Sequence, residues 1–469
     1  MDVSYFKGKK ITVLGLGLLG GGLGVVKFLV KHGARVIVTD MKSKEQLAFS
    51  LKKLEGIKNI EYVLGHHRPE DFTKVDMVVK NPAVAWDNKY IKMALDKKIP
   101  VEMDSSLFFQ LCKNTIIGVT GTKGKTTIAS MIFDLLKLVG KNAITVGIGT
   151  ASVLDKIEEL KKDSVVVFEL SSWRLSALSR IKKSPHIAVM KNILPDHLNY
   201  YKTMKEYIED KKNIFAFQGP KDCLIVNDDD EKVQEIIKES KARIFSFSEN
   251  SIKKNYSVFL ENGYIYLNNG IDVRKLVALE GIKIIGRHSI INAMAAIAAV
   301  YAFGVKISEI KEAVVKLKGI AHRMEFIREV SGVRYYNDTA ATIPQAAISA
   351  INSFDKKEII LIAGGSDKNL DFAEFAKEIV DYSKGIIFLK GNATEKLILE
   401  IRKNLPAEDK SKQFIIVDSM DKAVEFASRS AEKGDVVILS PGAASFGLFA
   451  NEFERGDKFR KAVNDLKER

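Results

Sequence analysis

A glycine- and lysine-rich turn has the clearest chemistry in the sequence: Gly121-Thr122-Lys123-Gly124-Lys125-Thr126-Thr127. It follows an apolar run and precedes a segment with apolar residues at helical spacing. Such a turn presents backbone N–H groups and the positive end of a helix to phosphate. We expect Lys125 to reach the β- and γ-phosphates of a nucleotide and Thr126 to ligate Mg²⁺. The alternative is a plain tight turn, which the strand, the helix and the Gly-Lys-Thr triplet argue against.

Two further residues could bind metal beside this turn. Glu169 follows the run VVVF, and an acid leaving a strand next to a phosphate-binding turn is typical of a Mg²⁺ ligand. The alternative is a solvated loop acid. His197 follows Asp196, which could orient its ring, although a structural histidine is the usual interpretation. One His and one Glu cannot complete a catalytic zinc site, but with an added anionic oxygen they could complete a second Mg²⁺ site.

A second glycine-rich turn lies near the N-terminus. Gly15, Gly17 and Gly20 follow a strand-like run, and Asp40 comes twenty residues after Gly20. This spacing is typical of a dinucleotide-binding turn. We favour another nucleotide diphosphate as its ligand; a nicotinamide enzyme and a purely structural turn are the alternatives.

Weaker motifs occupy the rest of the chain. They are Gly286-Arg287-His288 before Asn292, His322-Arg323 before Asp338, and Ser440 to Ser445. The first two are each compatible with ordinary capping and surface charge. The last follows the apolar run 435–439, and ligands of α/β proteins bind at that edge of a parallel sheet.

The elements that position these residues are buried strands alternating with helices. Short Val/Ile/Leu runs end in glycine or polar turns, and helix-length segments with apolar periodicity separate them. This pattern predicts an α/β fold with mainly parallel sheets. A helix is expected to start near Lys125 and end at Gly140, and an Ala-rich helix is expected at 292–303. We place three domains at 1–111, 112–319 and 320–469.

Composition sets the broad class. The chain has 469 residues, 46% hydrophobic and 28% charged, which suits a globular protein of about three domains. Two cysteines exclude a disulfide scaffold. The net charge of +14 is spread along the chain, so it is either solubility charge or attraction for phosphorylated substrates; we expect no nucleic-acid partner. Residues 11–30 are long enough to span a bilayer, but six glycines and Lys27 favour strand, turn and helix. We expect a cytoplasmic protein without membrane insertion.

Taken in order, the motifs resemble the Mur ligases, ATP-dependent enzymes that build the peptide stem of peptidoglycan. The resemblance rests on TGTKGKTT, ELSSWRL, NILPDHL, YIEDKKNI, GRHSIIN, HRMEF and GGSDK, and spans essentially the whole chain. SPGAASF, FERG and the GLG turn look most like the D-glutamate-adding members. The resemblance implies a Rossmann-like N-terminal domain for the UDP group, a central P-loop-type ATPase domain and a Rossmann-like C-terminal domain for the amino acid. It also implies addition of D-glutamate to UDP-N-acetylmuramoyl-L-alanine through an acyl phosphate. We expect the protein to be a monomer.

The resemblance also implies roles for individual residues. Lys125, Lys211, His197 and Arg323 are expected to be catalytic, with Lys211 carbamylated and Lys212 as the alternative lysine. Two Mg²⁺ sites would use Thr126, Glu169, His197 and Lys211. Asn292, Arg323 and Asp338 match contacts to adenine, γ-phosphate and ribose. Around D-glutamate the matching residues are Thr342, Lys368 and Ser445, and around UDP they are Gly15, Leu16, Asp40 and Lys42. We also expect the charge of Lys212 to lower the pKa of the Lys211 amine.

Four residues depart from the family pattern. Ser289 and Gly149 stand where Asn is usual, Ala340 replaces a Lys, and Glu452 replaces a Phe. They weaken the substrate assignment more than the ATPase assignment. The alternatives are therefore another Mur-type or folylpolyglutamate-type ligase, a non-catalytic nucleotide-binding partner, and an NAD-dependent dehydrogenase built on Gly15 to Gly20.

Overall fold

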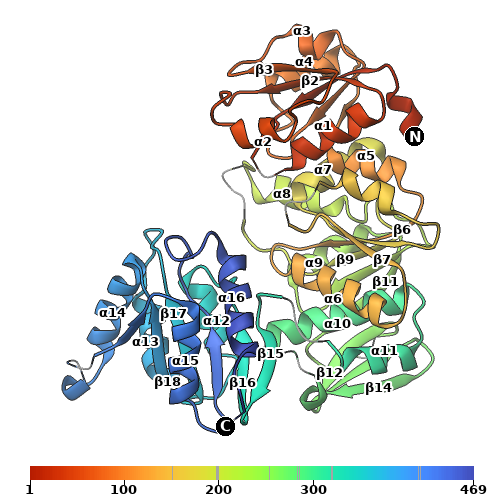
Figure 1. Ribbon diagram of the computed structural model, residues 1–469. Helices are drawn as coiled ribbons and strands as arrows, with labels where there is room; N and C mark the ends of the chain where they lie inside the picture. The colour runs from red at the N-terminus through yellow and green to blue at the C-terminus, as the bar shows by residue number, and fades with distance from the viewer. Residues whose placement is uncertain are drawn as a thin grey trace. The chain divides into compact units, whose positions relative to one another are not determined.

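A computed structural model describes residues 1–18, 20–149, 152–196, 200–252, 254–282, 284, 286–317, 321–409, 411 and 413–468. The chain forms two compact units (Figure 1). The first comprises Met1–Leu279 and Ile291–Val314, and the second comprises Glu280–Ile290 and Val315–Arg469. The first unit contains two sheets and the second contains one. The boundaries 1–111, 112–319 and 320–469 stay a prediction.

The N-terminal sheet has five parallel strands in the order β3-β2-β1-β4-β5. They are β1 (Lys10–Leu14), β2 (Arg35–Asp40), β3 (Ile60–Leu64), β4 (Met77–Lys80) and β5 (Val101–Glu102). The helices are α1 (Gly21–Lys31), α2 (Ala48–Lys52), α3 (Glu70–Thr73), α4 (Lys89–Asp96) and α5 (Asp104–Leu111). One apolar core joins α1 to one face of the sheet, and a smaller one joins α3 and α4 to the other. The predicted strand, turn and helix within residues 11–30 are confirmed.

The central sheet has nine strands in the order β14-β13-β12-β11-β10-β9-β6-β8-β7. They are β6 (Thr115–Thr120), β7 (Ala143–Val146), β8 (Val165–Glu169), β9 (Ile187–Met190), β10 (Cys223–Asn227), β11 (Arg243–Ser248), β12 (Ser257–Glu261), β13 (Tyr264–Asn268) and β14 (Val273–Ala278). The helices are α6 (Lys125–Leu138), α7 (Ser172–Ile181), α8 (Met204–Lys212), α9 (Glu231–Ile236), α10 (Arg287–Ala302) and α11 (Ile307–Val314). Neighbouring strands from β7 to β12 in this order pair in parallel. The pairs β12–β13 and β13–β14 are antiparallel.

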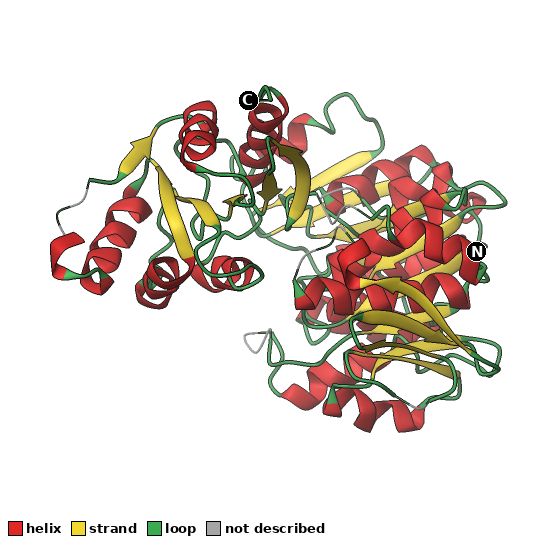
Figure 2. Ribbon diagram, turned by 90° about the horizontal axis from the view of Figure 1, so that it is seen from below, coloured by secondary structure: helices red, strands yellow, loops and turns green. Residues whose placement is uncertain are grey.

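The C-terminal sheet has the order β15-β16-β20-β17-β18-β19. Its strands are β15 (Glu325–Val330), β16 (Val333–Asn337), β17 (Ile359–Gly364), β18 (Ser383–Leu389), β19 (Ile415–Val417) and β20 (Val436–Leu439). Its helices are α12 (Pro344–Ile351), α13 (Ala373–Tyr382), α14 (Asn392–Asn404), α15 (Met420–Ser430) and α16 (Glu452–Asn464). Separate apolar cores place α15 and α16 on one face and α12, α13 and α14 on the other. Figure 2 shows the strands of this unit between its helices.

Short 3₁₀ segments complete the described elements: Val3–Phe6, Leu154–Glu159, Ile237–Glu239, Leu279–Gly281 and Ala407–Asp409. Within the described ranges, no helix combines the length and the apolar character that crossing a bilayer requires.

Two features differ from the sequence-based expectation. Helix α10 begins at Arg287, so Asn292 lies inside the helix, not at its start. The hairpins β12–β13 and β15–β16 were not predicted, although Asn262-Gly263 and Ser331-Gly332 join them. All four of these turn residues have positive φ, between 49° and 76°, as tight hairpin turns require.

Candidate active site

The glycine- and lysine-rich turn joins β6 to α6 and is anchored from the side. The N–H groups of Thr122 and Lys123 donate to Asn192 Oδ1 at 2.8 and 3.0 Å. The ammonium of Lys125 donates to the carbonyl oxygens of Gly121 and Thr122 at 3.1 and 3.0 Å. Gly124 has φ +89°, and α6 begins directly after it, as predicted. The turn is therefore a preformed cradle at the start of a fourteen-residue helix.

The sheet places the predicted metal ligands at the same edge as this turn. β6 lies between β8 and β9, and all three strands run parallel. Glu169 ends β8 opposite Val119, and Met190 ends β9 opposite Thr120. Thr126 lies in the first turn of α6 and is partly buried. Because the carboxyl ends of parallel strands share an edge, Glu169 lies next to the phosphate-binding turn.

Lys211 reaches this edge from α8 and is almost completely buried, with 1% of its surface exposed. Its Nζ donates to Thr120 Oγ1 at 3.5 Å and lies 4.8 Å from the centre of the Tyr207 ring. Burial, reinforced by the charge of Lys125, lowers the pKa of Lys211 to about 7. A substantial fraction of this amine is therefore neutral near neutral pH.

The expected role of Lys212 in that pKa shift is wrong. Lys212 forms ion pairs with Glu239 at 2.6 Å and Glu209 at 3.3 Å. Burial alone would lower the pKa of Lys212, but these hydrogen bonds outweigh it and raise the pKa. Adjacent helix residues point about 100° apart, so Lys211 faces the interior while Lys212 faces two carboxylates.

His197 lies outside the described residues, so its predicted metal role is untested. The neighbouring Asp196 forms an ion pair with Lys123 at 3.3 Å. Within the described chain, no three His, Cys, Asp or Glu side chains cluster as a metal site would require.

Asn292 approaches the same turn from α10. It is 5% exposed, and its buried Oδ1 has no hydrogen-bond partner among the described residues. A methyl group placed on Gly124 would lie 3.0 Å from that oxygen. The structure thus brings Asn292 to the phosphate-binding turn, and its adenine contact stays a prediction.

The N-terminal glycine turn is held by Asp40. Its carboxylate accepts from the N–H groups of Gly17 at 3.2 Å and Lys42 at 2.9 Å. The N–H of Gly15 donates to the Thr39 carbonyl at 2.8 Å. Leu16 is buried and the Lys42 side chain is exposed. Asp40 therefore shapes this turn.

A cavity of about 340 Å³ lies beside the N-terminal turn. Its lining includes Leu18, Gly20, Phe49 and two lysines, Lys27 and Lys53. The carboxylate of Asp155 lines the same cavity, and the charge of Lys27 acts on it. Sequence reasoning missed both lysines, because isolated lysines on helices resemble ordinary surface charge.

In the C-terminal unit, three loops meet at the carboxyl ends of β16, β17 and β20. Gly442 N–H donates to the Ala341 carbonyl at 2.9 Å, and Ser366 and Ala444 exchange two hydrogen bonds of 2.9 and 3.0 Å. These loops carry the predicted amino-acid contacts Thr342, Lys368 and Ser445. Lys368 is exposed, Thr342 is half-buried and Ser445 is buried.

Asp338 links the same loops and is 7% exposed. Its carboxylate accepts from Ser440 Oγ at 2.8 Å and from the Met324 N–H at 3.2 Å. Burial raises the pKa of Asp338 to about 7. These contacts give Asp338 a structural role, and its ribose contact stays a prediction. Arg323 is exposed.

Arg455 belongs to the FERG motif, for which no individual role was predicted, and lies beneath these loops with no exposed surface. Its Nε donates to Thr339 Oγ1 at 2.9 Å, and its terminal nitrogens donate to the carbonyls of Thr339 at 2.9 Å and Ala443 at 3.1 Å. An arginine on a polar helix is typical of a surface position. Its burial follows from the loops that pack over it.

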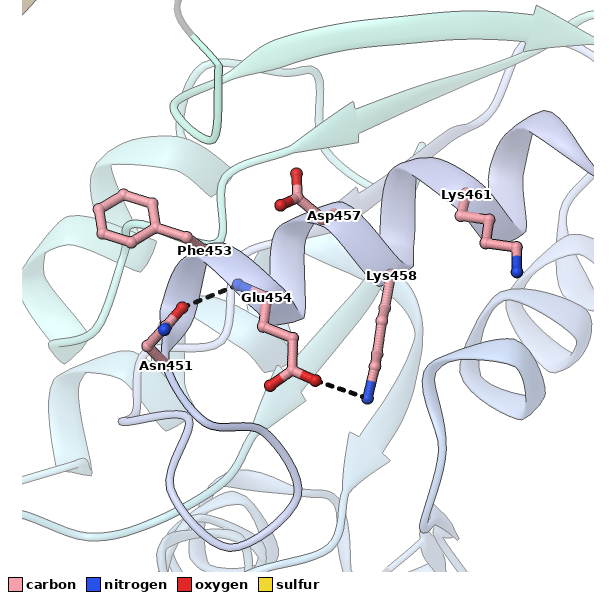
Figure 3. Close-up of a pocket in the computed structure, with 6 residues that line it drawn as sticks. All are labelled: Asn451, Phe453, Glu454, Asp457, Lys458 and Lys461. Atoms are coloured by element: carbon pink, nitrogen blue, oxygen red, sulfur yellow. Dashed lines mark hydrogen bonds and ion pairs between the residues drawn. The ribbon is translucent and has the colours of Figure 1, made fainter.

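An open pocket of about 450 Å³ follows one side of α16 (Figure 3). Its lining residues are Asn451, Phe453, Glu454, Asp457, Lys458 and Lys461. Asn451 caps the helix by accepting from the Glu454 N–H at 2.9 Å, and Glu454 pairs with Lys458 at 3.0 Å. The lining does not include Thr342, Lys368 or Ser445. This pocket is therefore not the predicted amino-acid site.

The fold and the preformed phosphate turn define an α/β nucleotide-binding protein of the P-loop type. Comparison with known proteins is more specific. The Mur ligase MurD-like N-terminal domain matches residues 9–102, the Mur ligase middle domain matches 119–300, and the Mur ligase glutamate ligase domain matches 322–442.

Full-length relatives agree with these matches. The UDP-N-acetylmuramoylalanine–D-glutamate ligase of Roseiflexus sp. (strain RS-1) is 38% identical over 98% of this chain and 99% of its own. The enzyme of that name from Borreliella afzelii (strain PKo) is 38% identical, and the match covers 99% of this chain and 100% of the relative. A solved UDP-N-acetylmuramate-alanine ligase from Thermotoga maritima shares the fold, with a TM-score of 0.54 and 20% sequence identity. The match covers 97% of this chain and 99% of the solved chain. The chain belongs to the Mur ligase family.

Proposed function

We propose that this protein is an ATP-dependent ligase that joins D-glutamate to UDP-N-acetylmuramoyl-L-alanine and releases ADP and phosphate. The observation that carries the proposal is the turn Gly121–Thr127, with Lys125 in it and Lys211 buried beside it. The names of the full-length relatives support the choice of D-glutamate and of the UDP-linked acceptor.

The chemistry explains why a nucleotide site is needed. A carboxylate does not acylate an amine in water, because oxide is a poor leaving group. Transfer of the γ-phosphoryl group of ATP to the carboxylate gives an acyl phosphate and ADP. The amine of D-glutamate then attacks the acyl carbon, a tetrahedral oxyanion forms, and phosphate leaves as the amide bond is made. All three substrates are anions, so Lys125 and Arg323 would hold the transferring phosphoryl group.

The Thr126 hydroxyl and the Glu169 carboxylate at this edge offer oxygen donors of the kind that Mg²⁺ prefers. Thr126, Glu169, His197 and Lys211 would hold two ions, whose charge would neutralise the phosphate oxygens. Lys211 would contribute as a carbamate, because a neutral amine and CO₂ give a carbamate and a proton. Its burial and its pKa of about 7 supply the neutral amine that this reaction needs. Loss of activity in Lys211→Ala, with partial rescue by a short carboxylic acid, would support this role.

The UDP-linked acceptor, ATP and the amino acid would each bind to a separate set of residues. Gly15, Leu16, Asp40 and Lys42 would bind the UDP group, and Asn292 and Asp338 would bind the nucleoside of ATP. The amino acid would contact a third set of residues, Thr342, Lys368 and Ser445.

An amino-acid acceptor screen tests the proposal. The full-length protein is incubated with ATP, Mg²⁺ and UDP-N-acetylmuramoyl-L-alanine, and phosphate release is measured for each amino acid. We expect release above background with D-glutamate alone. Release with a different amino acid would identify another ligase of the family. No release with any amino acid, despite measurable ADP binding, would indicate a non-catalytic nucleotide-binding protein.

A further inference from the structure

Lys191 is a buried lysine beside the phosphate-binding turn. It directly follows β9, and its backbone N–H donates to the Thr120 carbonyl at 3.1 Å, which ties it to the strand that leads into the turn. The residue is 8% exposed. A lysine seldom occupies such a position unless its charge is paired.

The side chain of Lys191 follows the turn from one glycine to another. A methyl group placed on Gly121 would lie 3.1 Å from Lys191 Cβ. A methyl group placed on Gly124 would lie 2.8 Å from Cδ and 2.6 Å from Nζ. The aliphatic part of Lys191 thus runs along the turn, and its ammonium ends at the residue that precedes α6. A side chain at Gly124 would collide with it.

The ammonium of Lys191 has no carboxylate, hydroxyl or carbonyl partner among the described residues. Burial alone lowers its pKa, to about 8. Asn292 Oδ1, which is buried without a partner, lies 3.0 Å from the same methyl position on Gly124. The ammonium of Lys191 and the unpaired Oδ1 of Asn292 therefore converge where α6 begins. Buried polar groups in native proteins are normally hydrogen-bonded, so this convergence indicates a ligand.

We propose that Lys191 is a second lysine of the nucleotide site, and that its ammonium binds the phosphate chain of a nucleoside di- or triphosphate alongside Lys125. This inference rests on the proposed function and adds a binding residue to it. An anion with several oxygen acceptors complements the ammonium of Lys191, a second ammonium on Lys125 and the N–H groups of a helix start. Because Lys191 reaches the turn from the buried strand beneath it, its contact is with the phosphates that ADP and ATP share.

The test measures ADP affinity in Lys191→Met, which removes the ammonium and keeps an apolar side chain of similar length. Isothermal titration calorimetry should show ADP binding at least tenfold weaker, while adenosine affinity stays within twofold. The Tm without nucleotide should stay the same or rise, since an unpaired buried charge is removed. Lys191→Gln keeps N–H donors without the charge, so its ADP affinity should lie between those of the wild type and Lys191→Met.

Lys80→Met is the matched control. Lys80 is also a buried lysine of the same unit, at 2% exposure, but its Nζ donates to the Val84 carbonyl at 2.8 Å and lies 4.5 Å from the Trp86 ring. Its replacement should leave ADP affinity unchanged and lower the Tm.

Three results would overturn the inference. One is unchanged ADP affinity in Lys191→Met. Another is an equal loss of ADP and adenosine affinity in both Lys191 variants, as a purely structural role predicts. The third is a lower Tm with normal ADP binding, which would make Lys191 an internal partner of Asn292. Because the readout is ADP binding, it stays informative even if the protein adds no D-glutamate.

Discussion

Each of the two units of this protein buries a cation that no described carboxylate pairs with. The two cations differ in whether other protein groups accept their hydrogen bonds. In the first unit, Lys191 ends at Gly124 without a partner. In the second, Arg455 donates to two carbonyls and a hydroxyl of the loops at 339 and 443, and burial lowers its pKa to about 10. A satisfied buried cation holds its own loops together. An unsatisfied one has capacity left for a ligand.

The comparison predicts that ligand-facing cations affect activity and that loop-holding cations affect stability. Lys125 also donates to two carbonyls of its own turn, but it is only partly buried, so a phosphate can reach it and it belongs to the first kind. Lys125→Ala should lower the rate of ATP-dependent phosphate release about 10³-fold, equivalent to roughly 4 kcal/mol, because the transferring phosphoryl group loses its fixed cation. Its Tm should change little. Steady-state kinetics with saturating substrates measures the effect.

Lys137→Ala is the control for that variant, since Lys137 is exposed in the last turn of the same helix. Its rate should stay within twofold of the wild type. A Lys125→Ala protein that retained more than a tenth of wild-type turnover would contradict the proposed nucleotide chemistry.

Arg455→Met should show the opposite pattern. It leaves the carbonyls of Thr339 and Ala443 buried without donors, and we expect the C-terminal unit to lose about 3 kcal/mol of stability. Hydrogen exchange of the β20 amides reports this loss within the unit. Arg455→Lys keeps the charge but fewer donors, so it should lose about half as much.

A different outcome would remove the distinction between the two cations. If Arg455→Met kept normal exchange rates and only raised the KM for the amino acid, Arg455 would serve a ligand as Lys191 is proposed to do.

Lys80 tests whether carbonyl partners are enough to keep a buried lysine charged. Burial lowers its pKa from 10.5 to about 7, Asp104 and Asp210 oppose the shift, and Arg180 adds to it. Between these values the unfolded chain keeps a proton that the folded chain has released. Wild-type stability should therefore rise with pH from about 7 toward 10, by at most about 1.4 kcal/mol per pH unit, and should be independent of this group below pH 7.

Lys80→Met removes that dependence. The unfolding free energy of the wild type minus that of the variant should increase by about 2 kcal/mol between pH 7 and pH 9. Urea unfolding at both pH values, followed by tryptophan fluorescence of the first unit, gives the difference. A difference that does not change with pH would mean that the Val84 carbonyl and the Trp86 ring hold the lysine protonated.

Much of this fold follows from local pattern. The strand, turn and helix expected within residues 11–30 form β1 and α1, and the helix expected from Lys125 forms α6. The turn 121–127 also lies where its neighbouring strand and helix required. These elements are predictable because a buried parallel strand and an amphipathic helix each require a distinct spacing of apolar residues.

The residues that were not predicted depend on contacts distant in the sequence. Lys191 and Arg455 are buried because a glycine turn and two loops pack over them, and charge alone gives no signal of this. The effect assigned to Lys212 failed for a similar reason, since sequence adjacency does not place two helix residues on one face. The hairpin at Asn262-Gly263, in contrast, had a local signal that was overlooked among the parallel elements.

That hairpin gives the smallest expected effect and a test that neither buried cation influences. Gly263 has φ +75°, and a methyl group there would meet open space, so Gly263→Ala adds backbone strain without a clash. We expect a loss of about 1 kcal/mol in stability and unchanged ADP affinity, because left-handed backbone is unfavourable for residues with Cβ. Gly219→Ala is the control: its backbone is not left-handed and its methyl would meet only ordinary contacts, so it should stay within about 0.5 kcal/mol of the wild type. Equal losses of stability for the two substitutions in urea unfolding would show that the positive φ of the turn has no energetic cost. A loss of ADP affinity in Gly263→Ala would show that stability and nucleotide binding are not separable in the first unit.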